Sequence, residues 1–248
     1  MLENTFIHLP NYGTTREQKL WKGGILTWDD FLDEFNSSPF HRQQCSIIAQ
    51  SKHALKTLDG FHFARALPSN ETWRCFQHYR KIAYLDIETT GCTYNDYITV
   101  IGLYDGSKTH SYVKGRNLSQ FARDIRKYNM VVTFNGSLFD LPFIRREMDA
   151  QLPSLHIDLR FLLASLNMTG GLKRIEEKFG MEREDDLKGL TGYDAVLMWR
   201  RYKKHKDKDE LDKLVRYNAA DVCNLEKLLN WGYKEKRKST GIDQLLGS

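Results

Sequence analysis

The most constraining feature of this 248-residue sequence is a change of pattern near residue 80. Before that point the apolar residues recur at helical spacing, which predicts helices over residues 15–23, 27–35 (with Thr27 as N-cap) and 42–58. After it come five short runs rich in β-branched and aromatic residues, which predict strands over residues 82–88, 97–105, 109–113, 130–135 and 155–159. We therefore predict a helical N-terminal segment over residues 1–79 and an α/β domain over residues 80–248.

The connections between the runs limit how the strands pair. Asp105 and Gly106 supply a hairpin-type turn between the second and third runs, whereas the segment LSQFARDIRKY between the third and fourth has helical spacing. The order is βββαβα, followed by helical patterns to the end of the chain. Three meandering strands and two that arrive through helical crossovers predict a five-stranded mixed sheet with helices on its faces.

Composition limits the class of protein and the compartment that we expect for it. A hydrophobic content of 41% supports a packed core, and the four cysteines lie far apart without CxxC spacing, which argues against a disulfide framework or a structural zinc site. No run approaches the roughly 20 apolar residues of a membrane span, and the N-terminus lacks the pattern of a signal peptide. We expect a cytoplasmic protein with no membrane partner and no organic cofactor, and the oligomeric state stays open.

Two carboxylates stand on the first predicted strand. Asp86 and Glu88 alternate with Leu85 and Ile87, so both acids project from one face of the strand while the apolar residues project from the other. On its own, such a pair fits a solvated acidic face as well as a functional site. Other carboxylates have to decide between these two interpretations.

Two further acids stand in patterns of their own. Asp140 lies among apolar residues in NGSLFDLPFI, where a strand leads into a helix, so it needs a partner and is also placed to cap that helix. Tyr217 and Asp221 lie four residues apart in a long amphipathic helix, which puts the phenol and the carboxylate on one face. Taken alone, that last pair is explained better by a half-buried tyrosine beside a surface aspartate.

Together, DIET on the first strand, NGxxxD at the strand-to-helix junction and YxxxD on a late helix resemble the three motifs of the ribonuclease H-like, DEDD-type 3'-5' exonucleases. The histidine variant of this family has His five residues before the last Asp, where this chain has Arg216, whereas Tyr217 matches the tyrosine (DEDDy) branch. NGSLFDLPFI is similar to the second motif in the proofreading domains of family B DNA polymerases. Over nearly its whole length the chain resembles the stand-alone predicted exonucleases of the YprB type, which implies a ribonuclease H-like exonuclease domain over residues 80–248.

This resemblance implies a hydrolase that uses two divalent ions, Mg²⁺ or Mn²⁺, which hard carboxylate ligands suit. By similarity, Asp86 would bridge both ions, and Glu88 and Asp221 would complete the site of the ion that holds the attacking water. Asp140 would act on the second ion, partly through water. Tyr217 would orient the attacking water, because a phenol with an ordinary pKa near 10 is a poor base at neutral pH.

Nucleic-acid contacts are predicted at two places. Thr89 and Thr90 end the first strand and Asn135 begins the NG turn, where they could contact the substrate strand or simply shape turns. Residues 200–208, RRYKKHKDK, hold six Lys or Arg and one Asp, which equals the formal net charge of +5 of the whole chain. This run is either a solvated loop or a grip on the phosphate backbone, and its nearness in sequence to Tyr217 favours the grip. The predicted backbone contacts are Arg200, Arg201, Lys203 and Lys204.

Two patterns leave alternatives open. Asp158, with His156 on the same strand face, could orient the metal ligands through hydrogen bonds or cap the following helix. Trp73, Phe76 and Tyr79 have helical spacing and could stack on unpaired bases, although a core stripe is the better interpretation.

The sequence as a whole predicts a 3'-5' exonuclease that acts on single-stranded nucleic acid, with DNA favoured. Single strands are favoured because the terminal phosphodiester must reach ions at the face of the sheet, which a blunt duplex end cannot do without unpairing. The alternative is a nucleic-acid-binding module on a catalytically inactive fold of the same kind. A third candidate, an endonuclease or resolvase, is disfavoured by the spacing of Tyr217 and Asp221.

Overall fold

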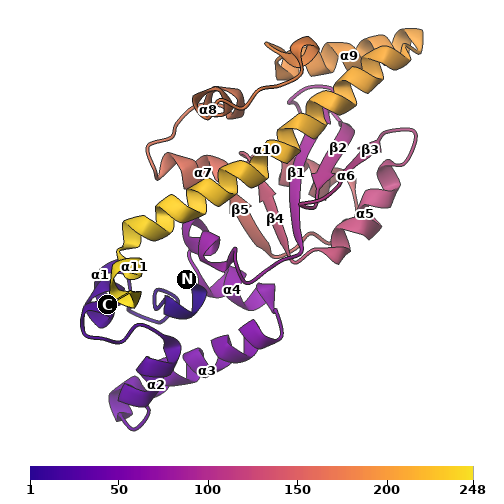
Figure 1. Cartoon of the computed structure of the whole chain (residues 1–248). Coiled ribbons are helices and arrows are strands. Elements are labelled where there is room, and N and C mark those ends of the chain that lie inside the picture. Colours follow the sequence, from indigo (N-terminus) through magenta and orange to yellow (C-terminus); the bar gives the residue numbers. More distant parts are fainter. Residues whose placement is uncertain (248) are drawn as a thin grey trace.

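Figure 1 shows the computed structural model of the chain, which describes residues 1–247. Within these residues a five-stranded sheet has the spatial order β3-β2-β1-β4-β5. The β1–β2 and β2–β3 pairs are antiparallel, whereas the β1–β4 and β4–β5 pairs are parallel. The strands are β1 (Ile82–Thr89), β2 (Ile98–Tyr104), β3 (Thr109–Val113), β4 (Met130–Thr133) and β5 (Leu155–Asp158). The predicted mixed sheet is therefore confirmed, with each strand close to its predicted bounds.

The hairpin between β2 and β3 forms at the predicted turn. The Asp105 carboxylate accepts hydrogen bonds from the backbone N–H groups of Ser107 (2.9 Å) and Lys108 (2.8 Å). Gly106 has a φ of 91°, a left-handed conformation that glycine adopts without steric cost. This turn fixes the register in which β2 pairs with β3.

The N-terminal part of the chain is helical, as predicted. Its helices are α1 (Thr14–Lys22), α2 (Trp28–Phe35), α3 (Arg42–Lys56), α4 (Gly60–Ala66) and the 3-10 helix Ser69–Cys75. Thr27 caps α2 through a reciprocal capping box with Asp30, which satisfies backbone donors at the start of the helix.

Helices cover both faces of the sheet. The α-helices that follow β3 are α5 (Phe121–Asp124), α6 (Asp140–Glu147), α7 (Leu159–Ala164), α8 (Leu172–Lys178), α9 (Gly192–His205), α10 (Lys208–Thr240) and α11 (Ile242–Leu246). Leu85 and Ile87 of β1 lie in the core that includes residues of α5 and α6. Tyr84, from the alternate set, shares a core with Leu228 of α10. The strand alternation therefore turns Asp86 and Glu88 toward α10.

The N-terminal helices share one continuous core with the sheet. Trp73 and Tyr79 are 1% and 0% exposed and belong to the cluster that contains Tyr84 and Leu228. The core interpretation of this aromatic stripe is thus confirmed, and these two rings are not available to stack on bases. Helix α10 extends beyond the sheet and leads to α11, which lies beside α1 (Figure 1). None of the helices within residues 1–247 is long and apolar enough to cross a membrane.

Candidate metal centre

The site begins where α10 approaches β1. Asp86 pairs across the sheet with Gly102 of β2, and a Cβ atom on Gly102 would lie 2.1 Å from Oδ1 of Asn218 on α10. Such a contact is far too short, so only glycine at this position allows the helix to pack this closely. The close approach brings the face of α10 that carries Tyr217 and Asp221 against the acidic face of β1.

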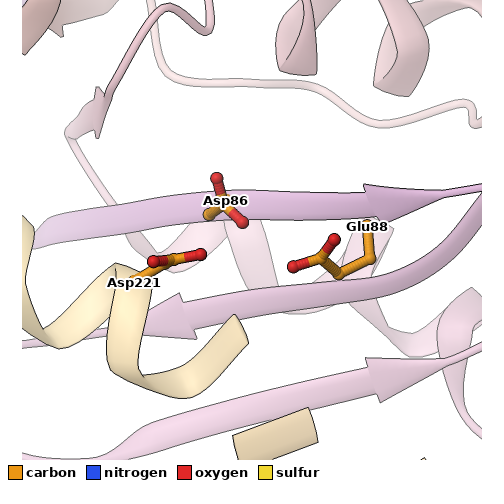
Figure 2. Close-up of side chains that lie close together, drawn as sticks. All are labelled: Asp86, Glu88 and Asp221. Atoms are coloured by element: carbon orange, nitrogen blue, oxygen red, sulfur yellow. The ribbon is translucent and has the colours of Figure 1, made fainter. Parts of the chain in front are cut away.

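Three carboxylates meet at this contact. Asp86, Glu88 and Asp221 each offer an oxygen atom within 4.8 Å of those of the other two, and Figure 2 shows their side chains close together. Glu88 and Asp221 are 7% and 6% exposed, and Asp86 is half-buried. The solvated-face interpretation of the strand acids and the surface interpretation of Asp221 are therefore both wrong.

The fourth predicted acid, Asp140, approaches from the other side of β1. It is the first residue of α6, where its carboxylate also interacts with its own backbone N–H. Its Oδ1 atom accepts a 3.0 Å hydrogen bond from the backbone N–H of Ile87, which lies between Asp86 and Glu88. Asp140 is outside the group of three that meets within 4.8 Å, yet it lines the same cavity of about 230 Å³ as they and Tyr217 do.

Burial concentrates negative charge at this centre. Removal from water raises the pKa values of Asp86 and Glu88 well above their usual range, and the neighbouring carboxylates raise them further. Burial also raises the pKa of Asp140 to about 7 and that of Asp221 to about 6, although Arg183 opposes the rise at Asp221. The protein alone therefore holds these four acids at an electrostatic cost that a bound cation would relieve.

Two basic residues that the sequence analysis missed lie against the site. Nη2 of Arg183 contacts Oδ1 of Asp221 and lies 2.6 Å from Oε2 of Glu176, and the Arg183 side chain is 93% buried. Nζ of Lys173 donates to the hydroxyl of Tyr217. Neither residue belongs to a motif, and no local periodicity points to them. Both lie in the segment 172–190, and they reach the site because this segment packs against α10.

Asn218 was also missed, although the sequence carried a usable signal. Its Nδ2 atom donates to Oδ2 of Asp86 at 2.9 Å and thereby orients that carboxylate. Asn218 stands three residues before Asp221 on α10, and residues three apart share a helical face. The YxxxD motif thus contains a second residue aimed at the site.

The predicted contact residues near the strand ends make bonds within the protein. The hydroxyl of Thr89 donates to the carbonyl of Gly91 (2.5 Å), and that of Thr90 donates to Oδ1 of Asp96 (2.8 Å). Thr89 and Asn135 line the cavity, and Asn135 has a φ of 67°, so it also forms the turn. These contacts explain both threonines as loop-shaping residues, and a role in substrate contact stays a prediction.

Asp158 serves as a cap and as a support. It accepts from the backbone N–H of Arg160 and so caps α7, as one of the two interpretations predicted. It also accepts from the backbone N–H groups of Asn135 (2.7 Å) and Ser137 (3.0 Å). The same carboxylate therefore fixes the turn that leads to Asp140. His156 is occupied elsewhere, with Nε2 at 2.8 Å from the hydroxyl of Thr133.

The basic run lies beside the cavity rather than in it. Gly192 and Val196 in the first half of α9 line the cavity, whereas Arg200, Arg201, Lys203 and Lys204 are exposed in its second half. A helix rises 1.5 Å per residue, so Lys204 lies about 18 Å along α9 from Gly192. Arg201 is also paired with Glu210 at 2.8 Å.

Comparison with known proteins identifies the class of protein. A family model of the RNase H superfamily matches residues 83–233, which is more than half of the chain. The chain therefore belongs to the RNase H superfamily, and its fold and acidic cluster together indicate a nuclease-type site. Carboxylate oxygens are the ligands that Mg²⁺ and Mn²⁺ prefer, so the donor set fits such ions.

One solved structure with a similar fold is the family B DNA polymerase from the hyperthermophilic archaeon Pyrobaculum calidifontis, with a TM-score of 0.45 and 15% sequence identity. The match covers 62% of this chain and 24% of the polymerase chain. No curated protein sequence matches this chain significantly.

Proposed function

We propose that this protein is a metal-dependent 3'-5' exonuclease of the DEDDy type, similar to the stand-alone YprB-type predicted exonucleases. Its substrate would be the 3' end of single-stranded nucleic acid, with DNA favoured. One observation carries the proposal: three carboxylates from β1 and α10 meet within 4.8 Å, and Tyr217 lines the same cavity one helical turn from Asp221. We further propose that residues 80–248 form the catalytic domain and that residues 1–79 form a helical segment packed on it.

The four acids would hold the metal ions. Asp86 is central, because it belongs to the carboxylate cluster and Asn218 fixes its orientation. Asp140 would contribute from the α6 side, where its bond to the N–H of Ile87 holds the carboxylate beside β1. Two divalent ions, when bound, would supply a hydroxide at neutral pH and stabilise the leaving oxygen of the phosphodiester.

Tyr217 is suited to orient the attacking water. Burial and the charges of Asp221 and Glu88 raise the pKa of its phenol further above 10, so it stays protonated at neutral pH. Because Lys173 donates to the phenol oxygen, the hydroxyl proton of Tyr217 points elsewhere and is free for a hydrogen bond to water or substrate. This arrangement argues for orientation rather than general base catalysis.

The central test is incubation of a 5'-labelled single-stranded oligonucleotide with Mg²⁺ or Mn²⁺. The native chain should shorten it one nucleotide at a time, and a chelator should stop the reaction. Asp86→Asn keeps the shape of the side chain and should lower the rate at least about 100-fold, since it removes a central ion ligand. Asp33→Asn, at an exposed position of α2, is the matched control and should keep the native rate.

Other outcomes would select the rival functions. An intact oligonucleotide that binds with salt-sensitive affinity would indicate a nucleic-acid-binding module with an inactive site. Internal cuts would indicate an endonuclease. For Tyr217→Phe we expect a slower rate with little loss of binding, and unchanged kinetics would remove Tyr217 from the mechanism.

The exposed second half of α9 would hold the phosphate backbone of the substrate. Replacing Arg200, Lys203 and Lys204 with Gln should weaken oligonucleotide binding and flatten its dependence on salt, because fewer counterions are released. Arg201 is left in place since it is paired with Glu210. If neither affinity nor salt dependence changes, the run is only solvated surface.

A further inference from the structure

A second cavity opens at the joint between the N-terminal helical segment and the sheet. Its volume is about 480 Å³, within the range of small-molecule sites. Its walls come from α4, the 3-10 helix Ser69–Cys75, the end of β5 and the start of α7, and include Ala64, Asn70, Trp73, His156, Phe161 and Leu162. Neither the sequence motifs nor the proposed metal centre account for this space.

The turn at residues 135–137 separates this cavity from the metal centre. Asn135 lines the cavity of the metal centre, and Ser137 lines the second cavity. Two residues of extended chain span at most about 7 Å, so the two cavities are neighbours on the scale of a single nucleotide. Asp158 binds the backbone N–H groups of both Asn135 and Ser137, which holds this partition in place.

The chemistry of the walls fits a nucleobase. Phe161 is 49% exposed where it lines the cavity, and Ala64 and Leu162 add apolar surface, so a flat ring can be covered on its face. Asn70 is exposed and its side chain has no hydrogen-bond partner within residues 1–247, which leaves an amide to pair with the edge of a base.

The charges at the partition fit a phosphate. Nη1 of Arg160 donates to Oδ1 of Asn135 at 2.6 Å, which places a guanidinium at the turn between the two cavities. Asp158 is the acid lining the second cavity, and it already accepts bonds from three backbone N–H groups and the Ser137 hydroxyl, so it needs no cation of its own. A cationic group at this turn is placed to bind a phosphate of a nucleic-acid strand that extends from one cavity to the other.

We propose that the second cavity binds the base of an inner nucleotide, one or two positions from the 3' end, while the terminal nucleotide occupies the metal centre. This inference rests on the proposed function in one respect, namely that a nucleic-acid strand binds at the metal centre. A base can enter the cavity only when it is unpaired, so the cavity would select single strands. The N-terminal helical segment would then form part of the substrate site.

The test combines one substitution with a series of substrates. Phe161→Ala should weaken binding of a single-stranded oligonucleotide about 5- to 100-fold, as expected for loss of one stacked base. Phe161→Trp keeps an aromatic face and should retain most of the affinity. Phe40→Ala, at a position that is 88% exposed and lines neither cavity, is the matched control.

The substrates carry one abasic site, moved one position at a time from the 3' end. The native chain should lose affinity when the abasic site falls at one inner position, and Phe161→Ala should be insensitive to an abasic site there. Equal sensitivity of the native chain and Phe161→Ala at every position, or native affinity in Phe161→Ala, would overturn the inference.

Binding is measured by fluorescence anisotropy in chelator, and cleavage is measured separately with Mg²⁺. Position-specific dependence on Phe161 without any cleavage would overturn the proposed exonuclease and leave the base site standing. Cleavage without that dependence would overturn the base site and leave the exonuclease standing.

Discussion

Two buried groups of charges in this protein differ in how completely they are paired. In the N-terminal segment, Glu17 is 1% exposed and its Oε1 atom accepts from the hydroxyl of Thr5 and the N–H of Phe6, both at 2.8 Å. Its Oε2 atom lies 3.1 Å from the guanidinium of Arg74, which also binds Glu71. Every charge in this group meets a partner of the opposite sign.

At the metal centre most of the acids lack such a partner. Within residues 1–247, Asp221 is the one member of Asp86, Glu88, Asp140 and Asp221 that directly contacts a basic side chain, that of Arg183. The pKa values of all four carboxyls are raised by burial, which is the mark of negative charge without sufficient compensation. A buried acid with full pairing therefore supports the fold, whereas a buried excess of acid suits a ligand that brings positive charge.

The largest change in stability is expected when one partner of the paired group is removed. Arg74→Ala leaves Glu17 buried without its cation and should lower the free energy of unfolding by about 3–5 kcal/mol. Urea denaturation measures this change. Arg42→Ala, an exposed arginine of α3, is the control and should change it by less than about 0.5 kcal/mol. A similarly small effect of Arg74→Ala would show that the pair does not support the fold.

Added divalent ions should act on the other group alone. At a Mg²⁺ or Mn²⁺ concentration 100 times the Kd, the free energy of unfolding should rise by about 2.7 kcal/mol, because the ion binds only the folded state. Urea denaturation with and without chelator gives the difference. The stabilisation should vanish in Asp86→Asn and persist in Asp33→Asn. If ions stabilised Asp86→Asn as strongly as the native chain, they would bind somewhere else.

Neutralising one acid in each group should have opposite effects on stability. In chelator at pH 8, Asp86→Asn relieves repulsion among the carboxylates and should raise the free energy of unfolding by on the order of 1 kcal/mol. Its amide oxygen can still accept the bond from Asn218. Glu17→Gln removes a paired charge and should lower the same quantity. If the free energy of unfolding changed in the same direction in both variants, the two groups would not differ in how fully their charges are paired.

The dependence of stability on pH is spread over several pH units. The folded-state pKa values of Asp140 and Asp221, about 7 and about 6, lie above the unfolded value near 4. Between about pH 4 and pH 7 the folded state therefore binds more protons than the unfolded state. In chelator, stability should fall as pH rises through this window, by up to about 1.4 kcal/mol per pH unit for each proton.

Two measurements check this pH dependence. Urea denaturation between pH 4.5 and 8 should show a shallower fall in stability for Asp140→Asn than for the native chain. Affinity for Mn²⁺ should rise over the same window, because the ion displaces the protons that the acids hold. An affinity that did not change with pH would mean that these acids are already ionised in the free protein.

Local patterns in the sequence determined the elements of the fold and the acids of the site. Period-two alternation placed Asp86 and Glu88 on one face of β1, and helical spacing placed Tyr217 one turn from Asp221. These are properties of neighbouring residues, so they can be predicted without knowing which elements pack together. The mixed sheet followed in the same way from turn residues and crossover segments.

Only the tertiary structure decided how the acids are surrounded. The contact of Arg183 with Asp221, the bond from Ile87 to Asp140 and the cavity beside Phe161 all join segments far apart in the chain. No local period encodes such contacts, because they depend on how whole elements pack. Local sequence patterns therefore predict which residues carry the charge, and packing sets which of those charges are paired within the protein and which are left for a cation.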